Sequence, residues 1–443
     1  MSIKRRNTIL AAGSLILMAI LFTTVLWHEE ESKPNIIIIL ADDYGYGDVG
    51  CYGSERFHTP NLDALAAGGL RFTDFHSNGT VCSPTRAAFL TGRYQQRTGI
   101  HGVVTAANHR HTGLDLEETT FAEVVKSAGY KTAIFGKWHV GYLPEYNPVR
   151  QGFDEFIGYV SGNVDYHAHL DQTGQEDWWK QDELVPENGY TTDLITDHGV
   201  EFIRRHSEEP FLLYLAHEAP HYPFQGRNDP PRYTRDSGRT KDPVTPEVYK
   251  EMIEVMDEGV GRIYQALKDE GLMENTFIFF FSDNGPASLG SAGALRGKKG
   301  QIWEGGHRVP AIAYWHGKIK SGGVSDLMAM GSDLLPTMAA ISGAELPETL
   351  LLDGINLLPH MTANKVPEAR PMFWATGKKL AIRQGDFKLI TDDSFSDISL
   401  YDLQTDLGEE NDVAAVYPEL VQELLEILKA WHEDVFKDVK RRT

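Results

Sequence analysis

Four short apolar runs constrain the fold of this chain more than any other feature of its sequence. The runs cover residues 35–40, 130–135, 211–216 and 277–281, and each is rich in β-branched or aromatic side chains. Amphipathic helical stretches lie between them, a pattern typical of strands that are buried on both faces of a parallel sheet. We therefore predict an α/β protein whose large, mainly parallel sheet is flanked by helices.

Polar residues with metal-binding or acid–base chemistry follow each of the four runs. They are Asp42 and Asp43, then Lys137 and His139, then His217 and His221, and finally Asp283 and Asn284. Ligands of open α/β sheets bind outside the carboxyl ends of the strands, so the four ends are expected to meet in one crevice. Turn formation or helix capping explains any one of these ends but not all four. We place the active site at this edge of the sheet.

The length of 443 residues favours one large domain with a smaller addition. We expect a catalytic domain over residues 34–345 and a C-terminal α+β part over residues 346–443. In the second part, short antiparallel strands are expected from Phe373 to Ile390. The segment from Pro418 to Phe436 has apolar residues at helical spacing and should pack on those strands as a helix.

The first 33 residues have the charge pattern of an exported protein. Lys4, Arg5 and Arg6 precede an apolar run from Ile9 to Trp27, and three glutamates follow the run. Such a segment keeps its positive end inside while the rest crosses the membrane. A cleaved signal peptide and an uncleaved anchor both fit, so the segment contacts either the export machinery or the membrane. We expect the remaining chain on the periplasmic or extracellular side.

The overall charge excludes a broad class of partners. With 63 acidic and 42 basic residues the net charge is -21, and a nucleic-acid backbone would be repelled by such a surface. An anionic substrate must therefore be attracted by positive charge that is local to the site.

Cys51 and Cys82 are the only cysteines, which is too few for a disulfide framework and leaves a single bridge between them as one alternative. Cys82 opens the segment Cys-Ser-Pro-Thr-Arg, and a Cys-x-Pro-x-Arg match arises by chance in roughly one chain in two hundred. The segment resembles the signature of the sulfatase family, and residues 129–139 resemble the second signature of that family. The resemblance extends from about Pro34 to the last helix.

The resemblance implies the alkaline phosphatase-like fold and a modified nucleophile. In the family the cysteine that matches Cys82 is oxidised to formylglycine by a separate maturation enzyme. The family's calcium ligands match Asp42, Asp43, Asp283 and Asn284, together with the modified Cys82. These side chains are hard oxygen donors, which favour calcium over zinc and make magnesium a less favoured alternative.

The resemblance also assigns roles to the charged residues around that nucleophile. His139 would accept a proton when sulfate is expelled, and His221 would protonate the leaving alcohol. Arg86, Lys137 and Lys299 would hold the hydrated aldehyde and the sulfate oxygens, where negative charge develops. Together they supply the local positive charge that an acidic protein needs for an anionic substrate.

An insertion over residues 161–179 is expected to lie above the pocket. We hypothesise that Asn163, Asp165 and His167 contact sugar hydroxyls while a tryptophan stacks on a sugar ring. A solvated loop with a small aromatic cluster is an equally good interpretation. The expected substrate is a sulfated sugar, a sulfated polysaccharide or an aryl sulfate.

Two other functions remain open from the sequence. A phosphate or phosphonate ester hydrolase of the same superfamily would share the Cys-x-Pro-x-Arg pattern, although it would need a second set of metal ligands for a two-metal site. A noncatalytic glycan-binding protein would keep the fold and the calcium but leave Cys82 unmodified. The combination of acid, base and anion-binding residues argues against the binding protein, because binding alone does not require it.

Overall fold

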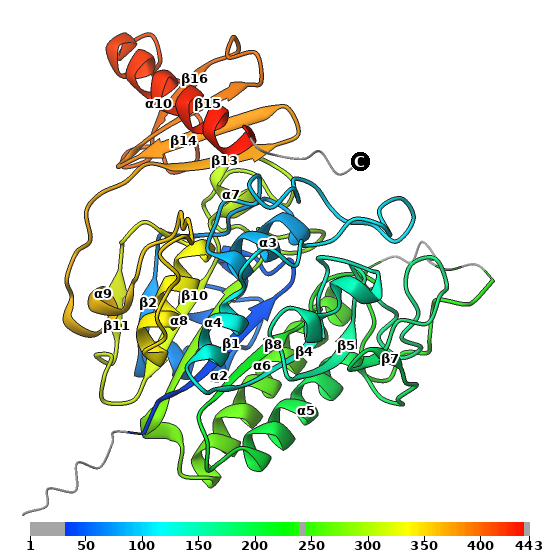
Figure 1. The fold of residues 1–443 in the computed structure, drawn as a ribbon. Coiled ribbons are helices and arrows are strands. Elements are labelled where there is room, and N and C mark those ends of the chain that lie inside the picture. The colour runs from blue at the N-terminus through cyan, green and yellow to red at the C-terminus, as the bar shows by residue number, and fades with distance from the viewer. Residues whose placement is uncertain (1–31, 237, 239–243, 438–443) are drawn as a thin grey trace, which may run out of the picture. The chain divides into compact units, whose positions relative to one another are not determined.

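A ten-stranded sheet forms the centre of the fold in the computed structural model (Figure 1). In spatial order its strands are Gly323–Ser325 (β11), Leu70–Phe72 (β2), Ala311–Trp315 (β10), Thr276–Ser282 (β9), Asn35–Ala41 (β1), Phe211–Ala216 (β8), Lys131–Lys137 (β4), Glu155–Tyr159 (β5), Trp179–Lys180 (β6) and Glu183–Leu184 (β7). The five strands from β9 to β5 run parallel, whereas β10 and β6 pair antiparallel at either side. The predicted large, mainly parallel sheet is confirmed.

The structure describes residues 32–236, 238 and 244–437. The apolar run from Ile9 to Trp27 lies outside these residues, and so does its expected role as a signal peptide or anchor. Within the described ranges, no helix combines the length and apolarity that a membrane crossing requires.

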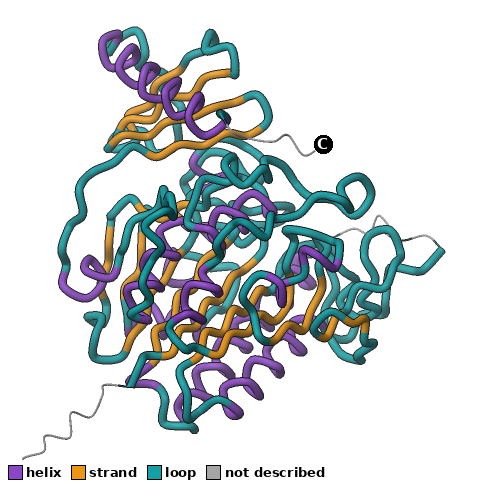
Figure 2. The backbone as a smooth tube through the Cα atoms, viewed as in Figure 1, coloured by secondary structure: helices purple, strands orange, loops and turns teal. Residues whose placement is uncertain are grey.

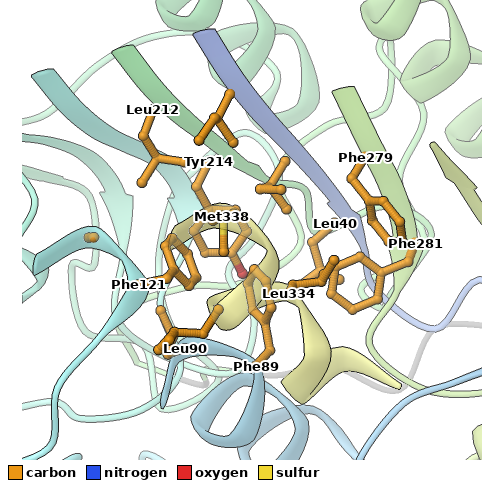
Figure 3. Packing of buried hydrophobic residues seen from close by; sticks show 14 of the residues in the cluster. Leu40, Phe89, Leu90, Phe121, Leu212, Tyr214, Phe279, Phe281, Leu334 and Met338 are labelled. Atoms are coloured by element: carbon orange, nitrogen blue, oxygen red, sulfur yellow. The ribbon is translucent and has the colours of Figure 1, made fainter. Parts of the chain in front are cut away.

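Alternate residues of β1 point to opposite faces of the sheet, as the two-residue repeat of a strand dictates. Ile36, Ile38 and Leu40 pack against one helical layer, which consists of α3 (Cys82–Thr91), α4 (Phe121–Ser127) and α8 (Leu334–Ser342). Ile37 and Ile39 pack against the other, which consists of α2 (Pro60–Gly68), α5 (Thr191–Arg205) and α6 (Pro246–Asp269). Figure 3 shows the first layer, where aromatic rings from α3, α4, β8 and β9 meet α8. Both faces of the central strands are therefore buried beneath helices.

A second, four-stranded sheet follows near the C-terminus and is antiparallel throughout. Its strands are Met372–Thr376 (β13), Lys379–Gln384 (β14), Phe387–Asp392 (β15) and Ser399–Asp402 (β16). Helix α10 (Pro418–Phe436) buries Leu424, Leu428 and Trp431 against it, and Trp431 stacks on Phe373 with ring centroids 4.9 Å apart. The predicted antiparallel strands and packed helix are confirmed, whereas a domain boundary at residues 345/346 stays a prediction.

The remaining elements are short and are joined by long loops, drawn teal in Figure 2. They are β3 (Phe75–His76) and β12 (Ala329–Met330), which pair with each other, α7 (Glu304–His307), α9 (Leu358–Ala363), and the 3-10 helices η1 (Tyr46–Asp48), η2 (Gly50–Tyr52), η3 (Pro144–Tyr146), η4 (Pro148–Arg150), η5 (Met273–Asn275) and η6 (Gly331–Asp333).

The four strands that carry the predicted polar ends are consecutive neighbours in the sheet, in the order β9, β1, β8 and β4. Their registers are aligned, because Ala41 pairs with Ser282 and Ala216 pairs with both Leu40 and Gly136. All four strands therefore end at the same level, and the polar residues that follow them meet at one edge.

Candidate active site

Cys82 is the first residue of α3 and follows Val81, whose extended backbone ends the preceding loop. Its side chain is buried, with Sγ 3.4 Å from Asp42 Oδ1 and 3.4 Å from Lys299 Nζ. Burial raises the pKa of the Cys82 thiol to about 12, and the carboxylate of Asp42 adds to that shift. The encoded thiol is therefore a poor nucleophile at neutral pH. Both cysteines are free, so the alternative of a bridge to Cys51 is not realised.

A cluster of ligand atoms surrounds Cys82. One donor atom each from Asp42, Asp43, Cys82 and His221 lies within 4.8 Å of the others. Strand β1 ends at Ala41, and Asp43 adopts a left-handed backbone conformation with φ 65°. Neighbouring residues of a continuous strand would point to opposite faces, so this break allows both carboxylates to face the same site.

Asp283 and Asn284 complete the predicted ligand set from the end of β9. Asp283 Oδ1 accepts a hydrogen bond from the Asp43 backbone N–H at 3.3 Å, and the Asn284 amide nitrogen donates to Asp43 Oδ1 at 2.7 Å. The side-chain oxygen of Asn284, Oδ1, is buried and accepts no hydrogen bond from any residue in the described ranges. A buried acceptor without a donor fits a metal ligand, and the oxygen-rich set fits calcium or magnesium better than zinc. His221 joins this cluster, although the sequence suggested it only as an acid.

Three cations, of which Arg86 and Lys137 are fully buried and Lys299 is half-buried, balance the carboxylates. Lys137 Nζ forms a short ion pair with Asp42, and Lys299 Nζ lies 2.6 Å from Asp43 Oδ1. Arg86, one turn after Cys82 on α3, donates to Asp283 Oδ2 from Nε at 3.2 Å and from a terminal nitrogen at 3.0 Å. The three residues predicted to bind anions therefore meet around Cys82, the predicted nucleophile.

These cations act unequally on the two buried carboxyl groups that they contact. Burial alone would raise the pKa of Asp42, but Lys137, His221 and Arg86 outweigh it and hold that pKa well below its usual range. Burial raises the pKa of Asp283 to about 7, with the charge of Asp42 adding to the shift and Arg86 opposing it. Asp42 is consequently a fixed anion, whereas Asp283 can hold a proton near neutral pH before a metal binds.

Backbone carbonyl groups fix the tautomers of the two histidines. His139 Nε2 lies 2.9 Å from the Val104 carbonyl oxygen, and His221 Nδ1 lies 2.7 Å from the Tyr222 carbonyl oxygen. A carbonyl oxygen can only accept, so both of these ring nitrogens carry a proton. His139 Nδ1 is buried without a hydrogen-bond partner in the described part of the chain, and His221 Nε2 lies 3.7 Å from Asp43 Oδ2. In the neutral rings, Nδ1 of His139 and Nε2 of His221 therefore carry no proton and can accept one.

Burial depresses the pKa values of both rings. The pKa of His139 lies well below its usual value because of burial and the nearby cations Lys137 and Arg86. Burial and the charge of Lys299 lower the pKa of His221 to about 4. Both rings are neutral at pH 7 in these surroundings, which suits a base and means that an acid must gain its proton during turnover.

A cavity of about 410 Å³ opens above this cluster. It is lined by Asp43, Cys82, Val103, Val104, Thr105, His139, Gly162, Asn163, Gln172, Pro220, His221, Tyr222, Phe224, Ala287, Ser288 and Lys299. Both the nucleophile position and the two histidines therefore face one space large enough for a sugar ring.

The three residues expected to contact substrate separate in the structure. Asn163 lines the cavity and donates to the Tyr233 hydroxyl at 2.9 Å. Asp165 is fully buried, and its two oxygens accept backbone N–H groups from the loop itself and from residues 232 and 233. His167 lines a different cavity and contacts the Gly226 carbonyl oxygen at 3.0 Å. Direct contact with a substrate in the first cavity therefore remains a prediction for Asn163, whereas Asp165 organises its loop.

Several cavity residues had no signal in the sequence. Val104 acts through its backbone carbonyl group, which every residue type possesses. Gln172, Tyr222 and Phe224 lie on irregular loops, where no periodic pattern indicates which side chains face a cavity. Only a structure could have identified them.

Comparison with known proteins agrees with the fold and this geometry. The family model described as Sulfatase matches residues 34–344. The chain is 36% identical to human arylsulfatase A over 90% of this chain and 88% of the human protein. It is also 36% identical to human N-acetylgalactosamine-6-sulfatase, over 78% of this chain and 69% of the relative.

Solved structures give the same result. The crystal structure of Ps i-CgsB superposes with a TM-score of 0.84 at 30% identity, covering 93% of this chain and 96% of that chain. Ps i-CgsB in complex with k-i-k-neocarrahexaose gives a TM-score of 0.82 over 90% of this chain and 93% of that chain. Fold and site thus define a sulfuric ester hydrolase with an alkaline phosphatase-like fold. The chain belongs to the sulfatase family.

Proposed function

We propose that this protein hydrolyses sulfate esters of carbohydrates, using a formylglycine made from Cys82 and one bound calcium ion. The observation that carries the proposal is the convergence on Cys82 of a carboxylate cluster, three cations and two histidines with opposite free nitrogens. The thiol itself, with its pKa raised by burial, would not perform this chemistry at neutral pH.

Calcium would be held by Asp42, Asp43, Asp283 and Asn284, and it would stabilise negative charge on the oxygens of the modified residue 82 and of the sulfate. Lys137 and Lys299 would hold those oxygens in place; Lys299 lines the cavity with a side chain that is 20% exposed, whereas Lys137 is fully buried beside Asp42. His139 Nδ1 would accept the proton whose removal allows sulfate to leave. His221 Nε2 would give a proton to the leaving sugar oxygen.

Carbohydrate sulfates are the proposed substrate class because of the cavity and the relatives. The space of about 410 Å³ has polar groups from Asn163 and Gln172 and aromatic rings from Tyr222 and Phe224, a combination that suits a sugar. Relatives are named for N-acetylgalactosamine 6-sulfate hydrolysis, and a neighbour was solved with a neocarrahexaose. We further propose that the protein is exported, and that a maturation enzyme oxidises Cys82.

Phosphate or phosphonate ester hydrolysis is the alternative to be tested. A two-metal site would need a second ligand group beside the first, and the second candidate group in the described ranges consists of His76, Glu304 and His307. Lys388 Nζ lies 3.0 Å from Glu304 and 3.1 Å from His307, so a protein cation already occupies that position. A single metal site favours hydrolysis of sulfate esters over hydrolysis of phosphate or phosphonate esters.

The decisive experiment measures modification and turnover on the same sample. The protein would be produced together with a formylglycine-generating enzyme, and the peptide that contains residue 82 would be analysed by mass spectrometry. Rates would be compared on 4-nitrophenyl sulfate, 4-nitrophenyl phosphate and phenylphosphonate esters, with Cys82→Ala as the inactive control. We expect an aldehyde or its hydrate and a preference for sulfate. Full activity with an intact thiol, or a large preference for phosphate, would refute the proposal.

A further inference from the structure

The loop that carries Lys299 has little regular structure of its own. It runs from Pro286 to Trp303, and the backbone N–H groups of Lys299 and Gly300 are both hydrogen-bonded. Lys299 N–H donates to the Pro286 carbonyl oxygen at 3.0 Å, and Gly300 N–H donates to the Thr80 carbonyl oxygen at 2.8 Å. The Lys299 side chain is held at its tip by the ion pair with Asp43 at 2.6 Å, so its position also depends on how well the backbone of the loop is fixed.

One residue of the C-terminal part contacts Arg296, inside this loop, and Glu304, the residue that follows it. Glu409 is fully buried and adopts a left-handed backbone conformation with φ 51°, which is uncommon for glutamate. Its Oε2 accepts the Glu304 backbone N–H at 2.7 Å, and its backbone carbonyl oxygen accepts a short hydrogen bond from the Arg296 guanidinium group. Arg296 also lies over the Trp303 ring at 3.6 Å. Glu409 therefore links Arg296 in the loop to Glu304, the first residue of α7.

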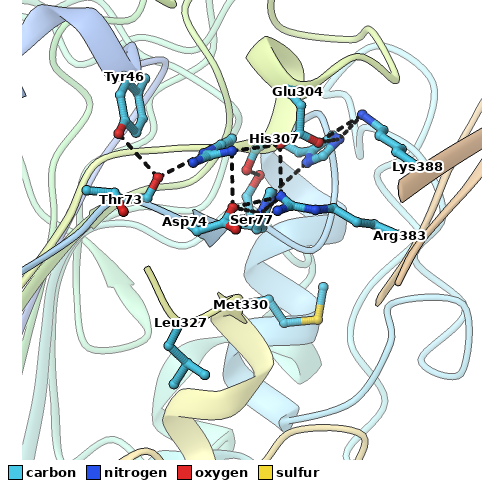
Figure 4. Close-up of polar contacts among 12 residues, drawn as sticks. Tyr46, Thr73, Asp74, Ser77, Glu304, His307, Leu327, Met330, Arg383 and Lys388 are labelled. Carbon is cyan, nitrogen blue, oxygen red and sulfur yellow. Dashed lines mark hydrogen bonds and ion pairs between the residues drawn. The ribbon is translucent and has the colours of Figure 1, made fainter. Parts of the chain in front are cut away.

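A buried charge cluster joins Glu409 and α7 to the second sheet, and Figure 4 shows its members Asp74, Glu304, Arg383 and Lys388. Lys388 of β15 lies 2.9 Å from Glu409 and 3.0 Å from Glu304. Arg383 of β14 lies 3.2 Å from Glu304 and 2.6 Å from Asp74. Removing one partner of a buried ion pair lowers the stability of a protein by several kcal/mol. The cluster therefore resists rearrangement and holds the residues next to the loop in place.

We propose that Glu409 is a positioning residue that places Lys299 over the sulfate-binding site. The proposal rests on the proposed function, because it takes sulfate as the group that Lys299 holds. The second sheet, which sequence patterns alone assign to packing, thereby contributes to substrate binding. A displacement of about 1 Å at a reacting group can cost about 100-fold in rate, so loosening the loop should be measurable.

The test compares Glu409→Ala with Glu409→Gln in the matured enzyme. Alanine removes the acceptor for Glu304 N–H, whereas glutamine keeps an oxygen there and loses only the charge toward Lys388. We expect Glu409→Ala to raise both KM for 4-nitrophenyl sulfate and the inhibition constant of inorganic sulfate by about tenfold. Glu409→Gln should restore both constants to within about threefold of the wild type while it lowers the melting temperature.

Arg296→Ala keeps the proposal testable if Glu409→Ala does not fold, because Arg296 is exposed and is not needed for the core. It should raise the same two constants, and Lys298→Ala, which removes an equal charge from the same loop, should not. Asp434→Asn is the matched control for docking of the second sheet. It breaks the ion pair between Arg97 and α10, far along the chain from the loop, and should leave the sulfate inhibition constant unchanged.

The outcomes separate the two proposals. If wild-type protein with formylglycine has no activity on sulfate esters, the proposed function fails. If the wild type is active but Glu409→Ala and Arg296→Ala change the sulfate inhibition constant no more than Asp434→Asn does, Glu409 serves stability alone and the positioning role is refuted.

Discussion

Replacing Arg86 with lysine tests whether the buried guanidinium group holds the site together. Arg86 is fully buried and makes four side-chain hydrogen bonds: two to Asp283 Oδ2, one to the Lys137 carbonyl oxygen at 3.0 Å and one to the Tyr214 hydroxyl oxygen at 3.3 Å. A lysine keeps the charge but can retain only one of these contacts without moving its neighbours. At about 1 kcal/mol for each of the three lost bonds, the free energy of unfolding should fall by about 3 kcal/mol.

The assay is urea unfolding followed by tryptophan fluorescence, on protein whose Cys82 is not modified. This choice matters because Arg86 lies in the motif that a maturation enzyme is expected to recognise, and the stability of unmodified protein does not depend on that step. Arg204→Lys is the control, since Arg204 is largely exposed and lies 4.0 Å from Glu270; its free energy should change by less than about 0.5 kcal/mol. If Arg86→Lys unfolds within about 0.5 kcal/mol of the wild type, the buried hydrogen bonds are not the source of stability that we infer.

Three further predictions concern the proton donor, the metal and the second sheet. His221→Ala should lose about 100-fold or more in kcat/KM on a sugar sulfate but much less on 4-nitrophenyl sulfate, whose leaving group needs little protonation; equal losses on both substrates would contradict the acid role. Chelation with EDTA should lower activity and the melting temperature, because Asp42 and Asp43 lose their shared cation, and calcium should restore both better than magnesium does. Burial opposes ionisation of Asp74, but a hydrogen bond with His76 and the ion pair with Arg383 outweigh it and hold the pKa of Asp74 well below its usual value. Its stabilisation is therefore fully present above its unfolded pKa and is lost as pH falls through and below that value, so the melting temperatures of Asp74→Asn and the wild type should begin to converge below about pH 5 and should draw closer as the pH falls further.

The central strands could be predicted because a parallel sheet covered on both faces leaves uninterrupted apolar runs in the sequence. The run at 35–40 became β1, with every residue of the strand buried. The outer strands had no such signal: β2, which lies next to the edge strand β11, spans only Leu70–Phe72, and its middle residue is half-buried. β16 was not predicted for the same reason. It has four residues, of which two are half-buried, and a sequence pattern this short cannot be distinguished from that of a turn.

The site was predictable to the extent that chemistry resides in side chains at strand ends. Asp42, Asp43 and Asp283 come directly after the strands that place them, and Lys137 is the last residue of β4. Lys299 required the family resemblance, because it lies on a loop. Asp165 shows the limit of this reasoning: the same carboxylate can bind a sugar hydroxyl or its own loop's N–H groups, and only the three-dimensional path of residues 232–233 decides between them.

The different roles proposed for the two histidines, proton acceptor for His139 and proton donor for His221, depend on hydrogen bonds to backbone atoms rather than to side chains. His139 is held by the Val104 carbonyl oxygen through Nε2, and His221 is held by the Tyr222 carbonyl oxygen through Nδ1. Because opposite nitrogens are fixed, the two free nitrogens differ as well, and each ring can serve one side of the reacting group. Val104 is itself tied to the nucleophile helix, since its N–H donates to Ser83 Oγ at 3.0 Å. The start of α3 therefore carries residue 82 and, through Ser83, also holds the Val104 backbone that fixes the tautomer of the proposed base.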